Sequence, residues 1–298
     1  MKNENMIHHF LTYIQYEKRL SKHTIKSYEN DLKQLSEFLE NHLSGLLPEK
    51  ASYQDLRGWV LNLLEQEYST ASVNRKVACV RAFYKYLLKQ KEITEDPTAK
   101  LRNLKMPKRV PSFVKEEEMQ VSSVVETTTR TFAELRDQMV IELLYGTGIR
   151  LSELLDLKVT DYQVTQGTIK VTGKGMKQRI IPCNRILSEY FSIYLKERGD
   201  LEHSYLIVTD KLAPAYPMLI QRIVKKHLLQ VSQVEKKSPH VLRHTFATHM
   251  LHRGADLNDI KELLGHANLS ATQVYTHHSL DQLKKSYKKA HPKSIENE

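Results

Sequence analysis

The sequence predicts a mainly helical protein with one small antiparallel β-sheet, an α+β fold divided between two domains. Three observations support this prediction. Apolar residues recur with helical spacing through the first hundred residues, a proline-punctuated basic segment follows, and two short β-prone runs flank a glycine-containing turn in the second half. A chain of 298 residues is long enough to form two cores.

Four amphipathic helices are expected in residues 1–99, the second of them starting near the capping candidates Ser21 and Thr24. Short helices of this kind can bury their apolar stripes only against one another, so the segment predicts a small helical domain. The four stripes are Ile7, Phe10, Leu11 and Ile14; Tyr28, Leu32, Leu35 and Phe38; Leu56, Trp59, Val60, Leu63 and Leu64; and Val73, Val77, Val80, Tyr84, Leu87 and Leu88.

The chain is basic, with 45 Lys and Arg against 35 Asp and Glu, a formal charge of +10 and a pI near 9.3. This balance favours an anionic partner, above all nucleic acid, although a basic surface without a partner is the alternative. Two predicted helices have basic polar faces, which are either solvated or placed to contact DNA phosphates. The candidates for phosphate contact on them are Lys22, Lys26, Arg75, Lys76 and Arg81.

Residues 100–111 are expected to form an extended, basic linker between the domains. Five basic residues and no acidic one lie between Lys100 and Arg109, and prolines at 97, 107 and 111 end any helix there. Such a linker could cross a DNA backbone, which makes Lys105, Lys108 and Arg109 further candidates for phosphate contact.

The second domain, residues 112–298, is expected to open with a helix over 133–150. Two β-prone runs follow, 168–171 and 179–181, joined by TGKGMKQ, whose glycines suit a hairpin with positive φ. Residues 205–208 could supply a third strand, and the chain is helical again to its end. The apolar stripe of Leu280, Leu283 and Tyr287 indicates a surface helix that packs on its own domain.

Four motifs stand out in this domain: TGIRLSEL at 147–154, VTGKGMKQR at 171–179, HVLRHTFATHM at 240–250 and LLGHANLSATQVYTH at 263–277. Together they resemble the tyrosine recombinase family of phage integrases and bacterial Xer proteins, and the Xer type most of all. The resemblance spans nearly the whole chain. It implies an N-terminal four-helix SAM-like domain that clamps DNA and a C-terminal catalytic domain. It also implies that the C-terminal helix docks on a neighbouring protomer, the alternative to packing on its own domain.

Arg150 and Arg243 suit the chemistry of that family. Transesterification at a phosphodiester adds negative charge to a five-coordinate phosphorus, and a guanidinium grips two oxygens without losing its proton. No spacing of carboxylates predicts a Mg²⁺ site, so fixed cations are expected to supply the charge. The alternatives are that Arg150 pairs with Glu153 at a helix end and that Arg243 is an ordinary surface charge.

The resemblance assigns the remaining catalytic roles. It implies that Lys174 protonates the departing 5′ oxygen, a step that an alkoxide leaving group requires. It also implies that His240 helps to accept the tyrosine proton or holds a phosphate oxygen, and that His266 donates a hydrogen bond to the phosphate. His240 and Arg243 are three residues apart, so they face one side of a helix. Lys174 could instead only contact phosphate, the role expected for Lys177 and Arg179.

Tyr275 matches the nucleophile of the family, which forms a 3′-phosphotyrosyl bond that needs no ATP to be resealed. A free phenol has a pKa near 10 and attacks poorly at neutral pH, so nearby cations must favour the phenolate. The alternative is a tyrosine that only packs a helix. No departure from the family pattern occurs at the six catalytic positions.

No metal or cofactor is expected. The spacing of His244, His249 and His252 resembles that of zinc ligands, but no Cys, Asp or Glu completes a site. Cys79 and Cys183 are too few for a disulfide framework, and neither a signal peptide nor a membrane span is evident, so a cytoplasmic enzyme is expected.

The favoured function is site-specific recombination on double-stranded DNA within a tetramer formed with itself or with a related recombinase. The Xer-like motifs favour resolution of chromosome dimers at cell division, with a DNA translocase as a possible activator. The same chemistry would serve the integrase of a mobile element. A DNA-binding architectural protein without catalysis is the alternative from another class, and the six catalytic residues argue against it.

Overall fold

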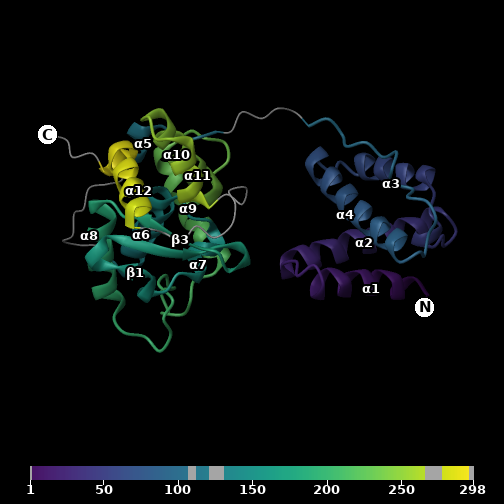
Figure 1. The fold of residues 1–298 in the computed structure, drawn as a ribbon, viewed down its shortest axis with the longest axis horizontal. Coiled ribbons are helices and arrows are strands. Elements are labelled where there is room, and N and C mark those ends of the chain that lie inside the picture. The colour runs from purple at the N-terminus through teal and green to yellow at the C-terminus, as the bar shows by residue number, and fades with distance from the viewer. Residues whose placement is uncertain (1, 107–111, 121–130, 266–276, 295–298) are drawn as a thin grey trace. The chain divides into compact units, whose positions relative to one another are not determined.

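The computed structural model describes residues 2–106, 112–120, 131–265 and 277–294. The chain forms two compact units, residues 1–109 and 110–298, each with its own apolar core. The division falls inside the segment 100–111 that the sequence predicts as a linker. Mainly helical architecture with one small antiparallel sheet confirms the predicted fold class (Figure 1).

The N-terminal unit contains the four expected helices: α1 (Lys2–Tyr16), α2 (Lys22–His42), α3 (Tyr53–Glu65) and α4 (Thr70–Lys89), with a 3₁₀ turn, η1 (Pro48–Lys50), before α3. Serine side chains accept from backbone N–H groups at the starts of α2, α3 and α4, because the first turn of a helix leaves these donors unpaired. The predicted stripes line the core, except that Leu64 and Leu88 are 38% and 40% exposed.

The first residues of the predicted linker are not free of the N-terminal unit. Leu101 is buried in that core, and the Asn74 side chain brackets Leu104 with hydrogen bonds of 2.9 Å to its carbonyl and 2.8 Å from its N–H. Arg81 donates to the Leu101 carbonyl and to Asn103. The extended-linker prediction is therefore wrong for residues 101–104, because these contacts dock the segment on α4.

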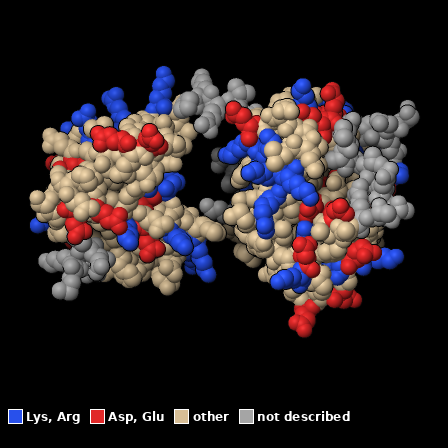
Figure 2. Space-filling view, turned by 180° about the vertical axis from the view of Figure 1, so that it is seen from behind, with Lys and Arg blue, Asp and Glu red and all other residues tan. Residues whose placement is uncertain are grey.

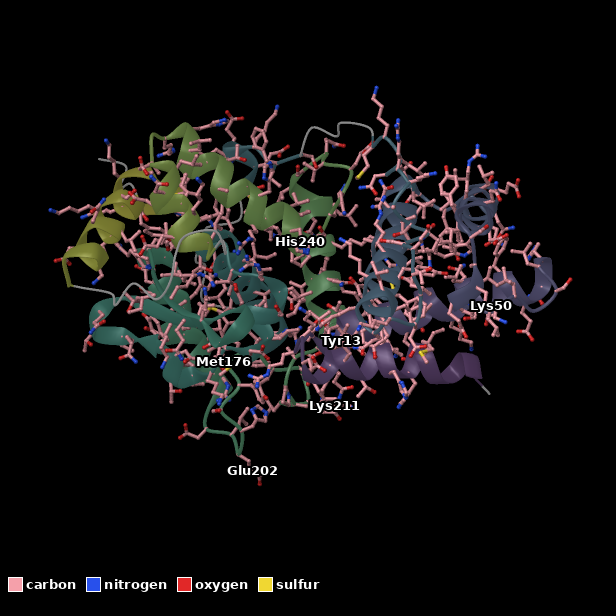
Figure 3. The ribbon with its side chains drawn as sticks, turned by 45° about the vertical axis from the view of Figure 1, so that its right-hand side comes forward. Tyr13, Lys50, Met176, Glu202, Lys211 and His240 are labelled. Atoms are coloured by element: carbon pink, nitrogen blue, oxygen red, sulfur yellow. The ribbon has the colours of Figure 1, made fainter. Side chains whose placement is uncertain are left out.

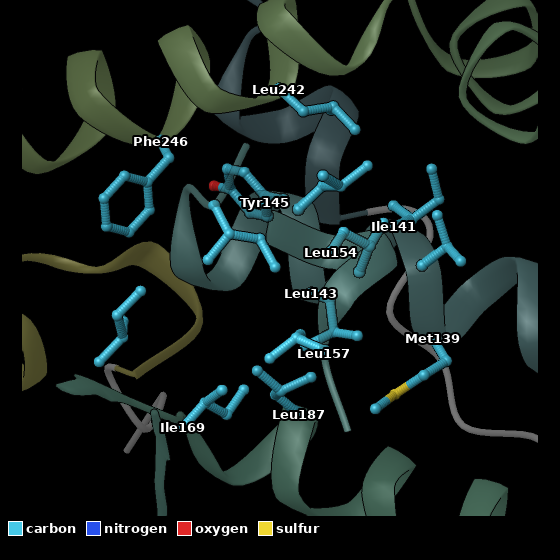
Figure 4. Close-up of a cluster of buried hydrophobic side chains, with 14 of the residues drawn as sticks. Met139, Ile141, Leu143, Tyr145, Leu154, Leu157, Ile169, Leu187, Leu242 and Phe246 are labelled. Atoms are coloured by element: carbon cyan, nitrogen blue, oxygen red, sulfur yellow. The ribbon is translucent and has the colours of Figure 1, made fainter. Parts of the chain in front are cut away.

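The C-terminal unit is built around α6 (Phe132–Thr147), whose residues from Met139 to Thr147 are all buried. Figure 4 shows side chains of α6 packed among those of its neighbours, such as Leu187, Leu242 and Phe246. A helix apolar on every side has to lie inside its domain. Around it lie α5 (Glu116–Gln120), α7 (Leu151–Asp156), α8 (Arg185–Arg198), α9 (Pro217–Val231), α10 (Pro239–His252), α11 (Leu257–Leu264) and α12 (His277–Ala290).

The sheet has the order β1–β2–β3 and is antiparallel throughout. Strands β2 (Thr168–Thr172) and β3 (Gln178–Pro182) form the predicted hairpin, in register from Thr168 opposite Pro182 to Thr172 opposite Gln178. The third strand is β1 (Tyr162–Gln163), not residues 205–208. That prediction is wrong: Tyr205 and Val208 form isolated bridges to Lys158 and Pro214. The Leu206 carbonyl and the Val208 N–H hydrogen-bond the Tyr194 hydroxyl of α8 instead of a neighbouring strand.

The C-terminal helix packs on its own domain. Leu283 and Tyr287 of α12 are buried, and the Tyr287 hydroxyl donates to the Gly146 carbonyl at 2.6 Å. Beyond α12 a 3₁₀ turn, η5 (Pro292–Ser294), brings the Lys293 ammonium to within 2.7 Å of the buried Glu142 carboxylate. Packing on its own domain is therefore found for Leu283 and Tyr287, whereas the side chain of Leu280 lies outside the described part of the chain. No helix in the described ranges has the length and apolar character to cross a bilayer.

Candidate active site

Arg150 is positioned by a tight turn between α6 and α7. Helix α6 ends at Gly148, which has φ +61°, and Arg150 is the N-cap residue of α7. A Cβ at Gly148 would lie 2.6 Å from Cδ1 of Phe246 and 2.9 Å from Cδ2 of Leu264. The glycine of the TGIR motif is therefore required both by its backbone conformation and by the close approach of α10 and α11.

Gly148→Ala should lower the free energy of unfolding by about 2–5 kcal/mol, the sum of a left-handed backbone and an overpacked core. Gly167→Ala is the matched control, because Gly167 has φ +58° and nothing within 4 Å of the added Cβ. Its loss should stay near 1 kcal/mol. Urea unfolding measures the free energy of unfolding of both variants. Equal losses would show that the contacts of Gly148 with Phe246 and Leu264 contribute nothing to the effect.

Arg150 and Arg243 meet at the C-terminal end of α11. The Leu264 carbonyl accepts from Arg150 Nη1 at 3.3 Å and from Arg243 Nη2 at 2.8 Å. Arg150 Nη2 also donates to the Gly265 carbonyl at 3.3 Å, and Arg243 Nη1 to the Gly148 carbonyl at 2.7 Å. These carbonyls have no helical partner and carry the negative end of the helix dipole, so they hold guanidinium groups well.

Arg243 keeps hydrogen-bonding capacity for a ligand. Its Nε and one hydrogen on each terminal nitrogen have no partner among the described residues. Burial and the neighbouring charges of Arg150 and Arg179 lower its pKa to about 10, so it stays protonated at neutral pH. Arg243 is half-buried beside two like charges, so the arrival of an anion such as a scissile phosphate would stabilise its charged form.

A buried ion pair lies directly behind Arg150. The Glu153 carboxylate accepts from Arg179 Nη1 and Nη2 at 2.9 and 2.8 Å, and from the N–H and Nη1 of Arg150 at 2.7 and 2.9 Å. The alternative that Arg150 pairs with Glu153 is therefore also realised. Arg150 and Arg179 share this one carboxylate, and Arg243 donates to backbone carbonyls, so the site holds an excess of positive charge.

The sequence predicts Arg179 to contact DNA, and the structure contradicts this prediction. Arg179 is 5% exposed, because both ends of its guanidinium are engaged with Glu153 and Nε donates to the Leu263 carbonyl at 2.7 Å. Spacing could not reveal the pair, since its partners lie 26 and 84 residues away in the sequence.

The ionisation of Glu153 should make the free energy of unfolding depend on pH in acidic solution. Burial alone would raise its pKa, but the hydrogen bonds and charges of Arg179 and Arg150 lower it from 4.5 to about 2. A lowered folded-state pKa stabilises the protein above pH 4.5, and this contribution is lost as the pH falls through 2.

Relative to Glu153→Gln, the wild type should therefore be more stable by about 3 kcal/mol at pH 7 and by roughly half of that at pH 3. Denaturant unfolding at both values measures the difference. Glu189→Gln is the control, since it removes an exposed pair with Arg185 and should cost under about 1 kcal/mol at either pH. A difference that does not change with pH would contradict the assignment.

Lys174 lies in a 3₁₀ turn, η4 (Lys174–Met176), between β2 and β3. The turn contains Gly175 with φ +73°, as the hairpin prediction requires, and Met176, 81% exposed and labelled in Figure 3. Gly173, the residue before Lys174, rests against the buried pair: a Cβ there would lie 3.2 Å from Glu153 Oε1. The backbone that carries Lys174 is thus supported by the residues that hold Arg150.

His240 is exposed in the first turn of α10, one turn before Arg243 (Figure 3). His266 and Tyr275 lie outside the described residues. Of the histidines with zinc-like spacing, His249 is buried and hydrogen-bonds through its two ring nitrogens with the Tyr145 hydroxyl and the Val114 carbonyl. Within the described ranges no cluster of three His, Cys, Asp or Glu side chains could hold a metal ion.

The predicted DNA contacts divide into exposed and internally paired residues. Lys76 is 7% exposed and donates to Asp31 at 2.9 Å and Gln34 at 2.6 Å, so the prediction that it tracks phosphates is wrong. Arg75 also pairs with Asp31 but remains half exposed. Exposed and available are Lys22, Lys26, Lys105 and Lys177; Arg81 is half-buried; Lys108 and Arg109 lie outside the described residues.

Lys and Arg side chains gather in a contiguous group on the visible face of the C-terminal unit in Figure 2. On the visible face of the N-terminal unit they are more scattered and lie among acidic side chains. The C-terminal unit thus presents a basic face to which an anionic polymer could bind.

Comparison with known proteins agrees with this site. Residues 115–282 match the phage integrase family, and residues 7–91 match the phage integrase N-terminal SAM-like domain. The tyrosine recombinase XerC of Chlorobaculum parvum (strain DSM 263 / NCIMB 8327) is 38% identical over 95% of this chain and 93% of its own. This chain belongs to the phage integrase family of tyrosine recombinases.

The recombinase has further relatives of the Xer type, such as the XerC protein of Bacillus subtilis (strain 168), 35% identical over 98% of both chains. Its fold is shared with the Tn1549 transposon integrase in complex with circular intermediate DNA (TM-score 0.70, 19% identity, 93% of this chain and 98% of that one). The XerH recombinase bound to palindromic difH is similar (TM-score 0.70, 22% identity, 88% and 78%). The family and enzyme class expected from the motifs are confirmed.

Proposed function

We propose that this recombinase cuts and rejoins double-stranded DNA at a specific site through Tyr275, with Arg150, Lys174, His240, Arg243 and His266 acting on the scissile phosphate. The observation that supports this most is the meeting of Arg150 and Arg243, distant in the sequence, at one carbonyl, that of Leu264. That carbonyl belongs to the LLGH motif, which leads through His266 toward Tyr275. Two cations are thus held where the motif with the nucleophile begins.

The reaction exchanges one phosphodiester for another. The Tyr275 oxygen attacks phosphorus as it loses its proton to a neighbouring base, the P–O5′ bond breaks, and Lys174 gives a proton to the departing 5′ oxygen. Arg150 and Arg243 bind the phosphate oxygens on which charge builds up. The 3′-phosphotyrosyl bond conserves the energy of the broken link, so a 5′ hydroxyl can reverse the step without ATP.

The similarity to Xer proteins suggests the biological setting. We propose a cytoplasmic enzyme that resolves chromosome dimers at cell division, within a tetramer on DNA formed with itself or with a related recombinase. A DNA translocase would be its activator. The similarity to XerC proteins over nearly the full chain supports this role over that of a mobile-element integrase.

A suicide DNA substrate tests the chemistry. A nick next to the cleavage point lets a short 5′ fragment diffuse away after attack, so the covalent protein–DNA adduct accumulates. We expect an adduct that survives denaturation, with the phosphate mapped by mass spectrometry to the peptide that contains Tyr275. An adduct on another residue would contradict the assignment of Tyr275 as the nucleophile. Specific DNA binding without any adduct would contradict the proposed recombinase activity.

Phosphate contact by the exposed lysines should appear in the salt dependence of binding. Lys22→Ala should reduce the slope of log K against log salt by about 0.9, the value for one lost phosphate contact. Lys76→Ala is the matched control on the same unit. It should leave the slope unchanged, because this side chain is buried against Asp31 and Gln34. Filter binding across a salt series measures both, and a change of slope in Lys76→Ala alone would contradict the assignment.

A further inference from the structure

Arg179 is a buried cation at the centre of the site that cannot reach DNA in this conformation. We propose that Arg179 is a positioning residue: paired with Glu153, it holds the hairpin that carries Lys174 against the Arg150 turn and the end of α11. The inference rests on the proposed function, in which Lys174 is the general acid, and adds a residue to it. Four sets of contacts support it.

The first set joins Arg179 to Arg150. Both guanidinium groups share Glu153 Oε1, at 2.9 Å each, and Glu153 Oε2 accepts from Arg179 Nη2 and the Arg150 N–H. The carboxylate thereby accepts four hydrogen bonds and has a single orientation that satisfies all of them. Loss of the Arg179 guanidinium would remove two of these four hydrogen bonds, whereas Arg150 would keep its own bonds to Glu153 and to the carbonyls of Leu264 and Gly265.

The second and third sets join Arg179 to the end of α11. Its Nε donates to the Leu263 carbonyl at 2.7 Å. Gly265, with φ +66°, lies so close that an added Cβ would be 3.1–3.3 Å from Nη1, Cδ and Cζ of Arg179. The Leu264 carbonyl between these two residues is the one that Arg150 and Arg243 share. Arg179 therefore supports the turn on which both cations rest.

The fourth set lies on the hairpin. Arg179 stands on β3 opposite Val171 of β2, and Gly173 follows that strand. The position of a Cβ on Gly173 is 3.2 Å from Glu153 Oε1 and 3.7 Å from Arg179 Nη1. The backbone entering Lys174 therefore packs on the ion pair itself. A Cβ at this position would press on the Glu153 carboxylate, so the ion pair would have to shift by a few tenths of an ångström.

An arginine is needed for this role. Its planar fork satisfies both carboxylate oxygens while Nε reaches a third acceptor in another direction. Lysine has a single ammonium and cannot serve Glu153 and the Leu263 carbonyl with the same geometry. Arg179→Lys should therefore keep the positive charge but no longer hold the hairpin that carries Lys174 in its position.

The test compares two leaving groups on a nicked DNA substrate, a normal 5′ oxygen and a 5′-bridging sulfur. A thiolate leaves without a proton, since thiol pKa values lie near 8.5, so sulfur removes the need for Lys174. Arg179→Lys should cleave the oxygen substrate about 10²-fold more slowly than the wild type, the cost of roughly 1 Å of misplacement. With sulfur the loss should shrink to within about tenfold, because the general acid is no longer needed.

Arg198→Lys is the matched control. Arg198 is also 5% exposed in the same unit and donates to the carbonyls of Gly199, His203 and Tyr205, away from the catalytic residues. It should show a similar loss in thermal stability and normal cleavage. If Arg179→Lys does not fold, Gly173→Ala tests the same contact with Arg179 intact, and the same rescue by sulfur is expected.

Equal losses with oxygen and sulfur, or normal cleavage by Arg179→Lys, would overturn the proposal. Lys174→Ala separates this failure from failure of the proposed function. If sulfur rescues Lys174→Ala but not Arg179→Lys, the general acid stands and the positioning role falls. If sulfur rescues neither, the assignment of Lys174 itself is wrong, and the inference falls with it.

Discussion

Tyr275→Phe is expected to abolish DNA cleavage while leaving DNA binding intact. The change removes one oxygen, the only atom of this side chain that can attack phosphorus. Loss of a nucleophile costs roughly 10⁴-fold or more in rate, because the remaining residues stabilise a transition state that no longer forms. On a suicide substrate the variant should give no covalent adduct, even after incubation long enough for the wild type to react fully.

Tyr216→Phe is the matched control for that loss. Tyr216 lies in the same unit, is 45% exposed, and its hydroxyl accepts one hydrogen bond from Arg222. Cleavage by this variant should equal that of the wild type. An adduct that persists in Tyr275→Phe would show that another side chain attacks, and loss of binding would show that Tyr275 is a docking residue.

Arg243→Ala is expected to have the second largest effect, a fall in cleavage rate of about 10²–10³-fold with DNA affinity within a few-fold of wild type. The reason is the position of Arg243: it is fixed by the carbonyls of Gly148 and Leu264 and keeps free donors for phosphate oxygens. A preorganised cation gains most where charge develops during the reaction. Single-turnover cleavage measures the rate, and a gel shift at matched salt measures the affinity.

The alanine variant also deletes two partly buried hydrogen bonds, so its stability must be measured beside its activity. A melting temperature well above the assay temperature would assign the loss to the reaction. Arg222→Ala controls for removal of a positive charge, since Arg222 is exposed in the same unit and should cleave normally. A fall in affinity as large as the fall in rate would make Arg243 a docking residue instead.

Helix positions and the catalytic motifs were predictable because both are local. The spacing of Phe10 and Ile14, or of Leu32 and Leu35, places them on one face of a helix whatever surrounds it. Ser21 caps α2 because its oxygen accepts from the N–H of Thr24, three residues on. The β2–β3 hairpin follows in the same way from two β-prone runs and Gly175.

Long-range packing accounts for the errors. Residues 205–208 have the composition of a strand, yet the Leu206 carbonyl and the Val208 N–H hydrogen-bond the Tyr194 hydroxyl of α8 rather than a neighbouring strand. Leu88 continues the apolar stripe of α4, yet it is 40% exposed. Asn74 draws Leu104 onto α4 through two hydrogen bonds that the basic composition of the segment gives no sign of.

By itself the sequence determined the helical character of the chain, a division within residues 100–111 and the types of residue available for phosphate chemistry. Only the tertiary structure decided which of the basic residues are free to act. Arg243 keeps free donors, whereas Lys76 and Arg179 are spent on Asp31 and Glu153, 45 and 26 residues away. A buried cation must be paired, and its partner is chosen by the packing of distant segments rather than by spacing along the chain.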